Sequence, residues 1–357
     1  MCGLAHRHTI FCILPPYLLR SVLMNGTQKQ KEAASATLGA DNTFRAMRAQ
    51  IAAATPLEVR RRRSALSAAP AKYRAIFTAK NSETLPGKAV RSEGQPKSDD
   101  KAVDEAYDGL GHTFDFFADV FQRNSIDDNG LPLNATVHYG DGYNNAFWNG
   151  QRMVFGDGDG TLFNRFTIAL DIIGHELGHG VTEDETGLVY MQQAGALNEH
   201  LSDVWGSLIK QKVRKQTAKQ ADWLIGAGLL TKSVQGKALR SMAEPGSAYD
   251  DPTLGKDPQP GHMDDYVETV QDNGGVHINS GIPNRAFYLA ATSISGFAWE
   301  TVGKVWYAAV RDDRVTEGTN FAQFAAVTID LAQALLKKTD AKAVAEAWAE
   351  VGVIATS

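Results

Sequence analysis

The sequence predicts an α+β fold, in which a β-rich part is followed by a helical part that begins near residue 170. Residues 71–165 contain short runs of β-forming residues. Asn149-Gly150 separates two of these runs, which is a strong short-range hairpin signal. From about residue 166 onward, apolar residues recur at helical spacing instead. Strands followed by helices, with no internal repeat, are typical of the α+β class.

The β-rich part is expected to contain one amphipathic helix, because Phe114, Phe117, Ala118 and Phe121 recur on one helical face. Strands are expected in three short runs, at residues 135–139, 147–148 and 153–155. In the helical part, two apolar stripes predict buried helix faces. They consist of Phe324, Val327, Leu331 and Leu335, and of Val344, Trp348 and Val351.

Residues 1–69 have the composition of a helical appendage that ends in a linker. They hold ten Lys/Arg and three Asp/Glu, a charge of +7, so with a total of −5 the remaining residues carry −12. Four arginines at residues 60–63 precede a run of small residues, a composition that favours exposure and mobility. We therefore expect three parts: residues 1–69, a β-rich lobe of residues 70–170, and a helical lobe of residues 171–357.

Composition excludes several classes of protein. The only cysteines are Cys2 and Cys12, so residues 70–357 contain no disulfide. No apolar run is long enough to span a membrane, and the best one, residues 9–19, is broken by Pro15 and Pro16 and lacks a signal-peptidase site. The mild net charge indicates no nucleic-acid partner, and residues 60–63 fit a solvated linker better than a nucleic-acid site.

The strongest chemical signal is His175-Glu176-Leu177-Gly178-His179. Residues four apart lie on one face of a helix, so both imidazoles can bind one zinc ion while Glu176 lies beside them. The alternative is an ordinary polar helix, which the motifs downstream make a weaker interpretation.

A catalytic zinc takes three protein ligands and keeps one open position. The third ligand is expected at Glu199, and Asp203, one helical turn later, can accept the free ring N–H of a ligand histidine. His200 is a rival ligand, although a surface or packing role suits it better.

A glycine-rich loop at residues 272–281 contains His277. Beside a zinc ion, His277 could stabilise a developing oxyanion, and Asp272 could orient its ring. Alone, such a loop is a weak signal.

These blocks resemble the thermolysin family from about Leu131 to the C-terminus, in the same order and at similar spacing. The supporting strings are residues 143–150, 156–160, 175–179, 198–203, 239–242 and 272–281. The N-terminal region resembles the short precursor segments of the protealysin group, through Pro15-Pro16-Tyr17-Leu18-Leu19. The resemblance implies a two-lobed α+β metallopeptidase with the zinc helix between its lobes and a short helical propeptide in front.

The resemblance also implies roles for individual residues. His175, His179 and Glu199 would bind one zinc ion, and Glu176 would be the general base for the zinc-bound water. Tyr190 and His277 would hydrogen-bond the tetrahedral intermediate, with Asp203 and Asp272 as supports. Peptide substrate would be held by Asn145, the backbone of Ala146, and Arg240. An apolar pocket for the residue after the scissile bond would be formed by Phe163, Phe166, Ile172 and Leu239.

A double calcium site near the zinc helix, frequent in the family, is not expected here. Asp171 and Asp222 match its ligands, but Lys210, Leu224 and Ala227 occupy positions where carboxylates would be needed. Asp157 and Asp159 have a calcium-like spacing, but a turn role suits them better.

The implied activity is an endopeptidase that cleaves before large hydrophobic residues and is made as a monomeric, self-processing zymogen. Its partners would be peptide substrates and its own propeptide, in which Cys12, Pro15 and Pro16 would act as inhibitory residues. Cys12 could place its thiolate on the zinc or serve as a small apolar anchor. Self-cleavage is expected between Arg63 and Lys72, with Leu66 as the most attractive point. The resemblance implies secretion, whereas the missing signal peptide leaves cytoplasmic retention open. Alternatives are a zinc exopeptidase and an inactive binding protein on the same fold.

Overall fold

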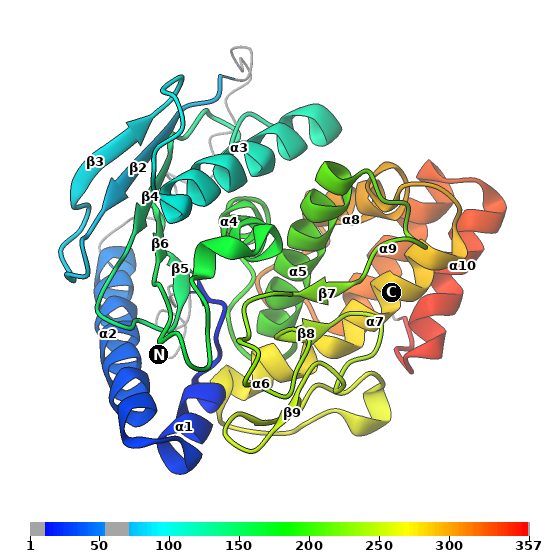
Figure 1. The fold of residues 1–357 in the computed structure, drawn as a ribbon. Helices are drawn as coiled ribbons and strands as arrows, with labels where there is room; N and C mark the ends of the chain where they lie inside the picture. The colour runs from blue at the N-terminus through cyan, green and yellow to red at the C-terminus, as the bar shows by residue number, and fades with distance from the viewer. Residues whose placement is uncertain (1–10, 54–70, 356–357) are drawn as a thin grey trace.

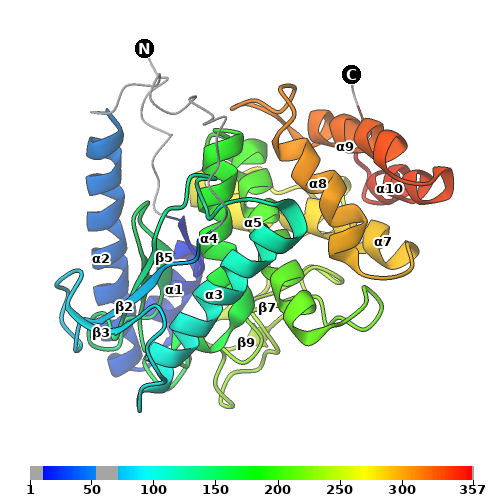
Figure 2. The same cartoon turned by 90° about the horizontal axis from the view of Figure 1, so that it is seen from above.

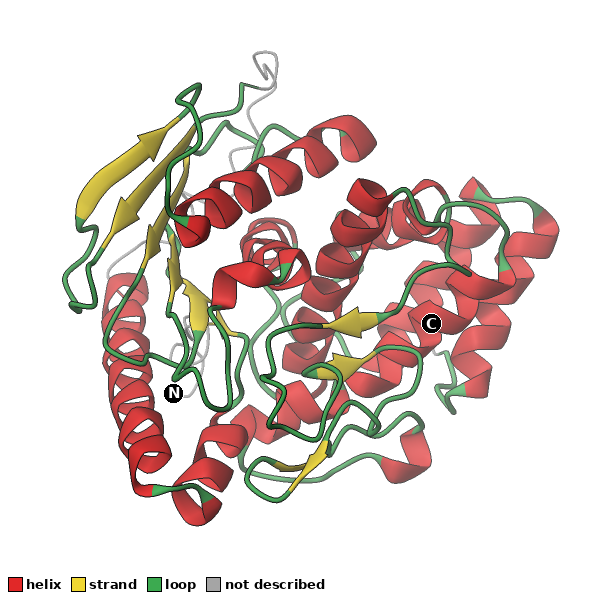
Figure 3. Cartoon of the chain, in the orientation of Figure 1, coloured by secondary structure: helices red, strands yellow, loops and turns green. Residues whose placement is uncertain are grey.

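The computed structural model describes residues 11–53 and 71–355, and the side chains of residues 12–43 and 71–355. The strands of the main sheet lie on one side of the molecule and most helices on the other, with a few short strands among those helices (Figure 1, Figure 3). The principal helices are α1 (Pro16–Asn25), α2 (Gln28–Ala53), α3 (Lys101–Phe121), α4 (Leu170–Glu185), α5 (Gln192–Arg214), α6 (Asp272–Asn279), α7 (Gly281–Ser293), α8 (Val302–Val310), α9 (Phe321–Leu335) and α10 (Lys338–Glu350). The strands are β1 (Phe11–Cys12), β2 (Arg74–Thr78), β3 (Lys88–Ser92), β4 (Leu133–Val137), β5 (Ala146–Trp148), β6 (Met153–Phe155), β7 (Leu224–Ile225), β8 (Arg240–Ser241), β9 (Asp250–Asp251) and β10 (Gly255–Lys256).

The main sheet has the strand order β1-β5-β6-β4-β2-β3. The predicted hairpin is confirmed, since β5 and β6 pair antiparallel around Gly150, whose φ of 90° suits a tight turn. One face of the sheet meets α2 and the other meets α3 and α4 (Figure 1, Figure 2). The predicted helix of the β-rich part is α3, which begins where the Asp100 side chain accepts hydrogen bonds from two N–H groups of the first turn.

The N-terminal segment supplies β1, an edge strand of the six-stranded main sheet. Phe11 pairs with Trp148 and Cys12 with Phe147, so β1 lies antiparallel along β5 at the edge of the sheet. The chain then enters α1 and α2, which Figure 1 shows below and beside the sheet. The predicted helical appendage is thus present, packed against the body of the protein. The predicted linker arginines and Leu66 lie outside the described residues.

The zinc motif lies on α4, which packs closely against α5. A Cβ atom on Gly206 of α5 would lie 2.3 Å from the Asp171 carbonyl oxygen, and one on Gly174 of α4 would lie 2.7 Å from Ile209. Glycine is therefore required where the two helices cross. This close approach brings the histidines of α4 within reach of the carboxylates of α5.

Two sequence expectations need correction. Leu335 is 54% exposed, because it is the last residue of α9 and the helix ends as its side chain reaches the surface. The strand expected at residues 135–139 is β4, which lies two residues earlier, at Leu133–Val137, because β2 pairs with it over those residues. The stripe of Val344, Trp348 and Val351 is buried as predicted. Within residues 11–53 and 71–355, every helix is too short or too polar to cross a membrane.

Candidate active site

Three ligand atoms converge between α4 and α5. Donor atoms of His175, His179 and Glu199 all lie within 4.8 Å of one another, and all three residues are buried. The Nε2 atoms of the two histidines are 3.0 Å apart. Glu199 Oε2 makes no hydrogen bond among the described residues and lies 3.5 Å from His175 Nε2. Two imidazoles and a carboxylate with an unsatisfied buried oxygen are the donor set that fits a zinc ion.

Each histidine is oriented by a second residue. Asp203 Oδ1 lies 2.8 Å from His175 Nδ1, as the sequence predicted. Asn198 Oδ1 lies 2.7 Å from His179 Nδ1, a support that sequence reasoning missed although Asn198 directly precedes Glu199. Both contacts leave Nε2 directed at the cluster. Burial, and then the nearby His175, lower the pKa of His179 well below its ordinary value, which favours the neutral, metal-binding form.

Glu176 lies beside this cluster rather than in it. Its Oε2 accepts a hydrogen bond from the Trp148 N–H of β5 at 3.1 Å. Burial raises the pKa of Glu176 well above its ordinary value and the charge of Glu199 raises it further, while N–H groups of Trp148 and Ile13 act in the opposite direction. A carboxyl with a raised pKa is suited to both accepting and returning a proton.

His277, Tyr190 and Asp272 form a second group around the same cluster. The Tyr190 hydroxyl donates to Glu199 and lies 3.2 Å from His277 Nε2. Asp272 Oδ1 lies 2.7 Å from His277 Nδ1, and its Oδ2 accepts from the His277 backbone N–H at 2.9 Å. Burial opposes protonation of His277, but the charges of Asp272 and Glu199 raise its pKa overall.

The loop that carries Asp272 has an unusual backbone. Residues 272–275 all have positive φ values, of 52°, 52°, 83° and 75°. This left-handed turn directs the Asp272 carboxylate back over the following helical turn, where it contacts the backbone N–H and the ring of His277. Gly274 and Gly275 adopt the conformation without cost, whereas Asp272 and Asn273 belong to the residue types that tolerate it best.

The residues expected to hold a peptide already hold one, namely the N-terminal segment of this chain. The Ile13 N–H donates to the Ala146 carbonyl at 3.3 Å. Asn145 contacts both polar groups of Leu14, with Oδ1 accepting from the N–H at 3.0 Å and Nδ2 donating to the carbonyl at 3.4 Å. Arg240 Nη1 donates to the Ile13 carbonyl at 3.3 Å.

The Cys12 carbonyl oxygen lies 3.3 Å from His277 Nε2. The peptide bond between Cys12 and Ile13 therefore lies beside His277. Ile13 is fully buried in the same apolar cluster as the expected pocket residues, which are Phe163, Phe166, Ile172 and Leu239. Ile172 and Leu239 both approach Gly226, and the rings of Phe163 and Phe166 lie 6.1 Å apart.

The Cys12 side chain faces the opposite side of the sheet. It belongs to a separate buried cluster with Tyr139, Tyr143 and Phe147, whereas the zinc helix packs on the other face. This position supports the apolar anchor over the thiolate ligand. Pro15 is extended, with φ −68° and ψ 149°, and Pro16 begins α1, so the extended segment ends at Pro15. Pro16 and Arg20 of α1 still line the cavity beside Tyr190 and His277.

The two carboxylates that match calcium ligands of the family, Asp171 and Asp222, contact the ammonium group of Lys210. Lys210 Nζ lies 2.8 Å from Asp171, 2.7 Å from Asp222 and 2.6 Å from the Leu224 carbonyl oxygen. Asp159 caps a turn through three N–H groups and Asp157 pairs with His138, in agreement with a turn role. His200 is buried, and burial lowers its pKa to about 4, so it packs in the core and is not a surface residue.

Comparison with known proteins gives the same answer as the geometry. Residues 46–183 match the family described as thermolysin metallopeptidase, catalytic domain, and residues 186–353 match thermolysin metallopeptidase, alpha-helical domain. An extracellular metalloprotease of Pectobacterium carotovorum subsp. carotovorum is 53% identical over 96% of both chains. The protease PrtS of Photorhabdus sp. (strain Az29) is 46% identical over 96% of this chain and 91% of its own.

Among solved structures, the precursor of protealysin, a metalloproteinase from Serratia proteamaculans, is 54% identical. Its TM-score is 0.87, and the match covers 96% of this chain and 99% of that one. The chain belongs to the thermolysin family of zinc metallopeptidases. It is accordingly a zinc-dependent metalloprotease, and His175, His179 and Glu199 form the group that fits the ion.

Proposed function

We propose that the protein is an endopeptidase that cleaves on the N-terminal side of large hydrophobic residues and is made as a self-processing zymogen. The observation that carries this proposal is the path of residues 12–14 through the cleft. A carbonyl faces His277, the following N–H and carbonyl meet Ala146 and Arg240, and the next residue is held at both ends by Asn145. A substrate strand held by the same groups would place its scissile bond between the residues that correspond to Cys12 and Ile13.

This register supports the proposed specificity. The residue after the scissile position is Ile13, which is apolar and fully buried, and it belongs to the main hydrophobic core that also contains the expected pocket residues. A pocket walled by two phenylalanines and two aliphatic side chains favours large hydrophobic groups through the apolar area that it buries.

The proposed roles follow from position. When bound by His175, His179 and Glu199, zinc lowers the pKa of a water molecule and polarises the substrate carbonyl. Glu176 takes the proton of the attacking water and then delivers it to the leaving nitrogen. Tyr190 and His277 donate hydrogen bonds to the developing oxyanion, while Asp272 holds the His277 ring. Asp203 holds His175.

The zymogen proposal rests on the same contacts. Residues 12–14 of the head (residues 1–69) contact the groups that would hold substrate, and the body would divide into lobes of residues 70–170 and 171–357. The similar solved structure is itself a precursor, which supports this assignment. We further propose that the protein is secreted, because a relative carries the name extracellular metalloprotease. We also propose that it is a monomer.

Glu176→Ala tests the proposed mechanism. The variant should bind one zinc ion per chain and lose casein hydrolysis, because the ligands remain and the proton acceptor is gone. Near-normal hydrolysis by a fully loaded variant would contradict the mechanism. Wild-type cleavage of a peptide blocked at both ends would exclude the exopeptidase and the inactive binding protein together.

A further inference from the structure

A continuous chain of hydrogen bonds joins the core of the helical lobe to His175. Trp306 Nε1 lies 2.8 Å from His200 Nε2, and His200 Nδ1 lies 2.8 Å from Asn284 Oδ1. Asn284 Nδ2 then donates to Asp203 Oδ2 at 2.9 Å, and Asp203 Oδ1 lies 2.8 Å from His175 Nδ1. The five residues come from helices α8, α5, α7 and α4.

Water cannot replace any link in this chain. All five side chains have zero relative exposure. A buried polar atom that loses its partner therefore keeps the full cost of desolvation, about 1–3 kcal/mol. Such networks fix one arrangement when every member is satisfied.

The indole N–H of Trp306 determines which atom donates and which accepts in the hydrogen bonds that follow, as far as Asp203. An indole N–H only donates, so His200 Nε2 must accept and its Nδ1 must carry the proton. The Asn284 oxygen consequently faces His200, and its amide N–H₂ faces Asp203. Reversing the Asn284 amide would leave an oxygen against a carboxylate. The donor at Trp306 thus sets the side of Asn284 that meets Asp203.

The Asp203 carboxylate makes four hydrogen bonds with three residues, two on each oxygen. Oδ1 receives His175 and Arg240 Nη2, whereas Oδ2 receives Asn284 and Arg240 Nε. Arg240 also contacts the bound strand at Ile13. Asn284 is therefore the support of Asp203 that does not also contact the peptide in the cleft.

We infer that Trp306, His200 and Asn284 are positioning residues that hold Asp203, and through it the ring of His175, in the orientation that binds zinc. This inference rests on the proposed assignment of His175 as a zinc ligand. It gives His200, which sequence reasoning treated as packing, a role in the metal site.

The test measures the zinc dissociation constant by chelator competition on the full-length chain in a Glu176→Ala background. Asn284→Leu removes the amide at similar volume and should weaken zinc binding about tenfold, the lower end of the usual effect of residues that support metal ligands. Trp306→Phe, which removes only the terminal donor, should weaken it about threefold.

Trp223→Phe is the matched control. Trp223 is also buried and donates its indole N–H at 2.8 Å, but to the Ala218 carbonyl, outside the chain. Its loss should reduce unfolding temperature comparably and leave zinc affinity unchanged. Equal effects of Trp223→Phe and Trp306→Phe on zinc affinity would overturn the inference, as would unchanged affinity in Trp306→Phe or, where it folds, in Asn284→Leu.

His175→Ala separates this inference from the proposed function. Loss of zinc binding in His175→Ala with no change in Trp306→Phe would reject the positioning chain alone. Unchanged zinc affinity in His175→Ala would reject the ligand assignment itself.

Discussion

His277 has one ring nitrogen available to a reacting peptide, because Asp272 lies 2.7 Å from the other. That available nitrogen lies 3.3 Å from the Cys12 carbonyl oxygen of the head. A donor fixed in this way contributes to the transition state without reorganising first. Its removal should therefore affect the rate of hydrolysis more than the metal.

His277→Ala should lower kcat/KM by about two to three powers of ten, the usual scale for losing one oxyanion donor. Zinc content, measured on the same preparation, should remain at one ion per chain. A variant that lost its zinc as well would show that His277 is a ligand or a structural residue.

Lys210 pairs with both Asp171 and Asp222, so we expect the fold not to depend on calcium at this cluster. Burial disfavours the charged ammonium, but the two carboxylates raise the pKa of Lys210 overall. Lys210→Ala would leave Asp171 buried without its cation, so we expect a loss of about 3 kcal/mol in unfolding free energy.

Wild-type thermal unfolding should accordingly respond weakly to millimolar calcium. A rise in Tm of about ten degrees or more would contradict this, since a bound ion stabilises in proportion to its affinity.

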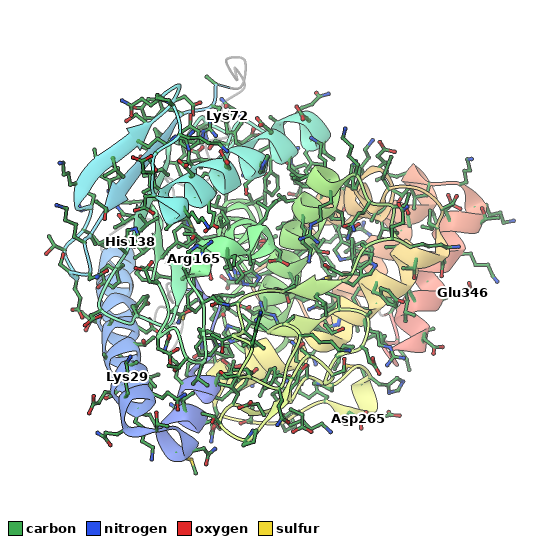
Figure 4. All side chains as sticks on the ribbon, viewed as in Figure 1. Lys29, Lys72, His138, Arg165, Asp265 and Glu346 are labelled. Carbon is green, nitrogen blue, oxygen red and sulfur yellow. The ribbon has the colours of Figure 1, made fainter. Side chains whose placement is uncertain are left out.

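At the scale of elements, His138 joins the start of α3 to the turn after β6. Its two nitrogens lie 2.7 Å from Asp157 and 2.8 Å from Asp100, the residue that caps α3. Figure 4 shows His138 on the sheet side of the molecule. The hydrogen bond with Asp157, opposed by burial and assisted by Asp100, raises the pKa of His138 to about 9.

Because the folded pKa lies above the ordinary value near 6.5, this pair stabilises the fold fully below about pH 6.5. The contribution should be lost as pH rises through about 9. His138→Gln should therefore lower Tm at pH 6 and have little effect at pH 10. An equal loss at both pH values would mean that packing, not charge, gives His138 its role.

Helix α2 contacts residues 143–145, which directly precede β5, through Asp41. This carboxylate is 2% exposed and accepts hydrogen bonds from the Tyr143 hydroxyl at 2.5 Å and from Asn145 Nδ2 at 3.0 Å. Thr37 of the same helix accepts from the Asn144 N–H at 3.0 Å. The head therefore contacts residues 143–145 through α2, in addition to the pairing of β1 with Phe147 and Trp148.

Asp41→Ala should weaken the hold of the head and speed maturation of the full-length chain about tenfold, as expected for the loss of hydrogen bonds to a buried charge. Glu32→Ala is the control, because Glu32 is an exposed acid on the same helix. Time courses on gels would measure both. Equal rates for Asp41→Ala and wild type would show that the Asp41 contacts do not limit release of the head.

At the scale of the whole molecule, the sequence predicts motifs formed by residues close together in the chain. It does not predict pairing between segments that are far apart in the chain. The zinc helix and the β5–β6 hairpin depend on residues a few positions apart, and both are present. The pairing of Cys12 with Phe147 joins segments separated by more than a hundred residues, so no local pattern encodes it. The supports at Asn198, Asn284 and Asp41 likewise depend on how helices pack.

The same pairing bears on the proposal that a head of charge +7 inhibits a body of charge −12. Opposite charges favour association, although salt screens them beyond about 10 Å. The specific contacts come from β1 on β5 and from α2. Because the prolines at 15 and 16 end the extended segment and resist productive placement of a peptide bond, we expect cleavage in the linker between Arg63 and Lys72, with Leu66 as the favoured point, and not at Cys12-Ile13.

The central claim, a zymogen that removes its own head, is tested most directly by the N-terminal mass of purified wild-type and Glu176→Ala chains. Wild type should lose about 65 to 70 residues, as a linker at an exposed boundary would allow, and a chelator should prevent the loss. The Glu176→Ala chain should stay at full length. Removal of the head from that variant in a protease-free preparation would contradict self-processing, and a mature N-terminus within residues 1–50 or beyond residue 80 would contradict the boundary.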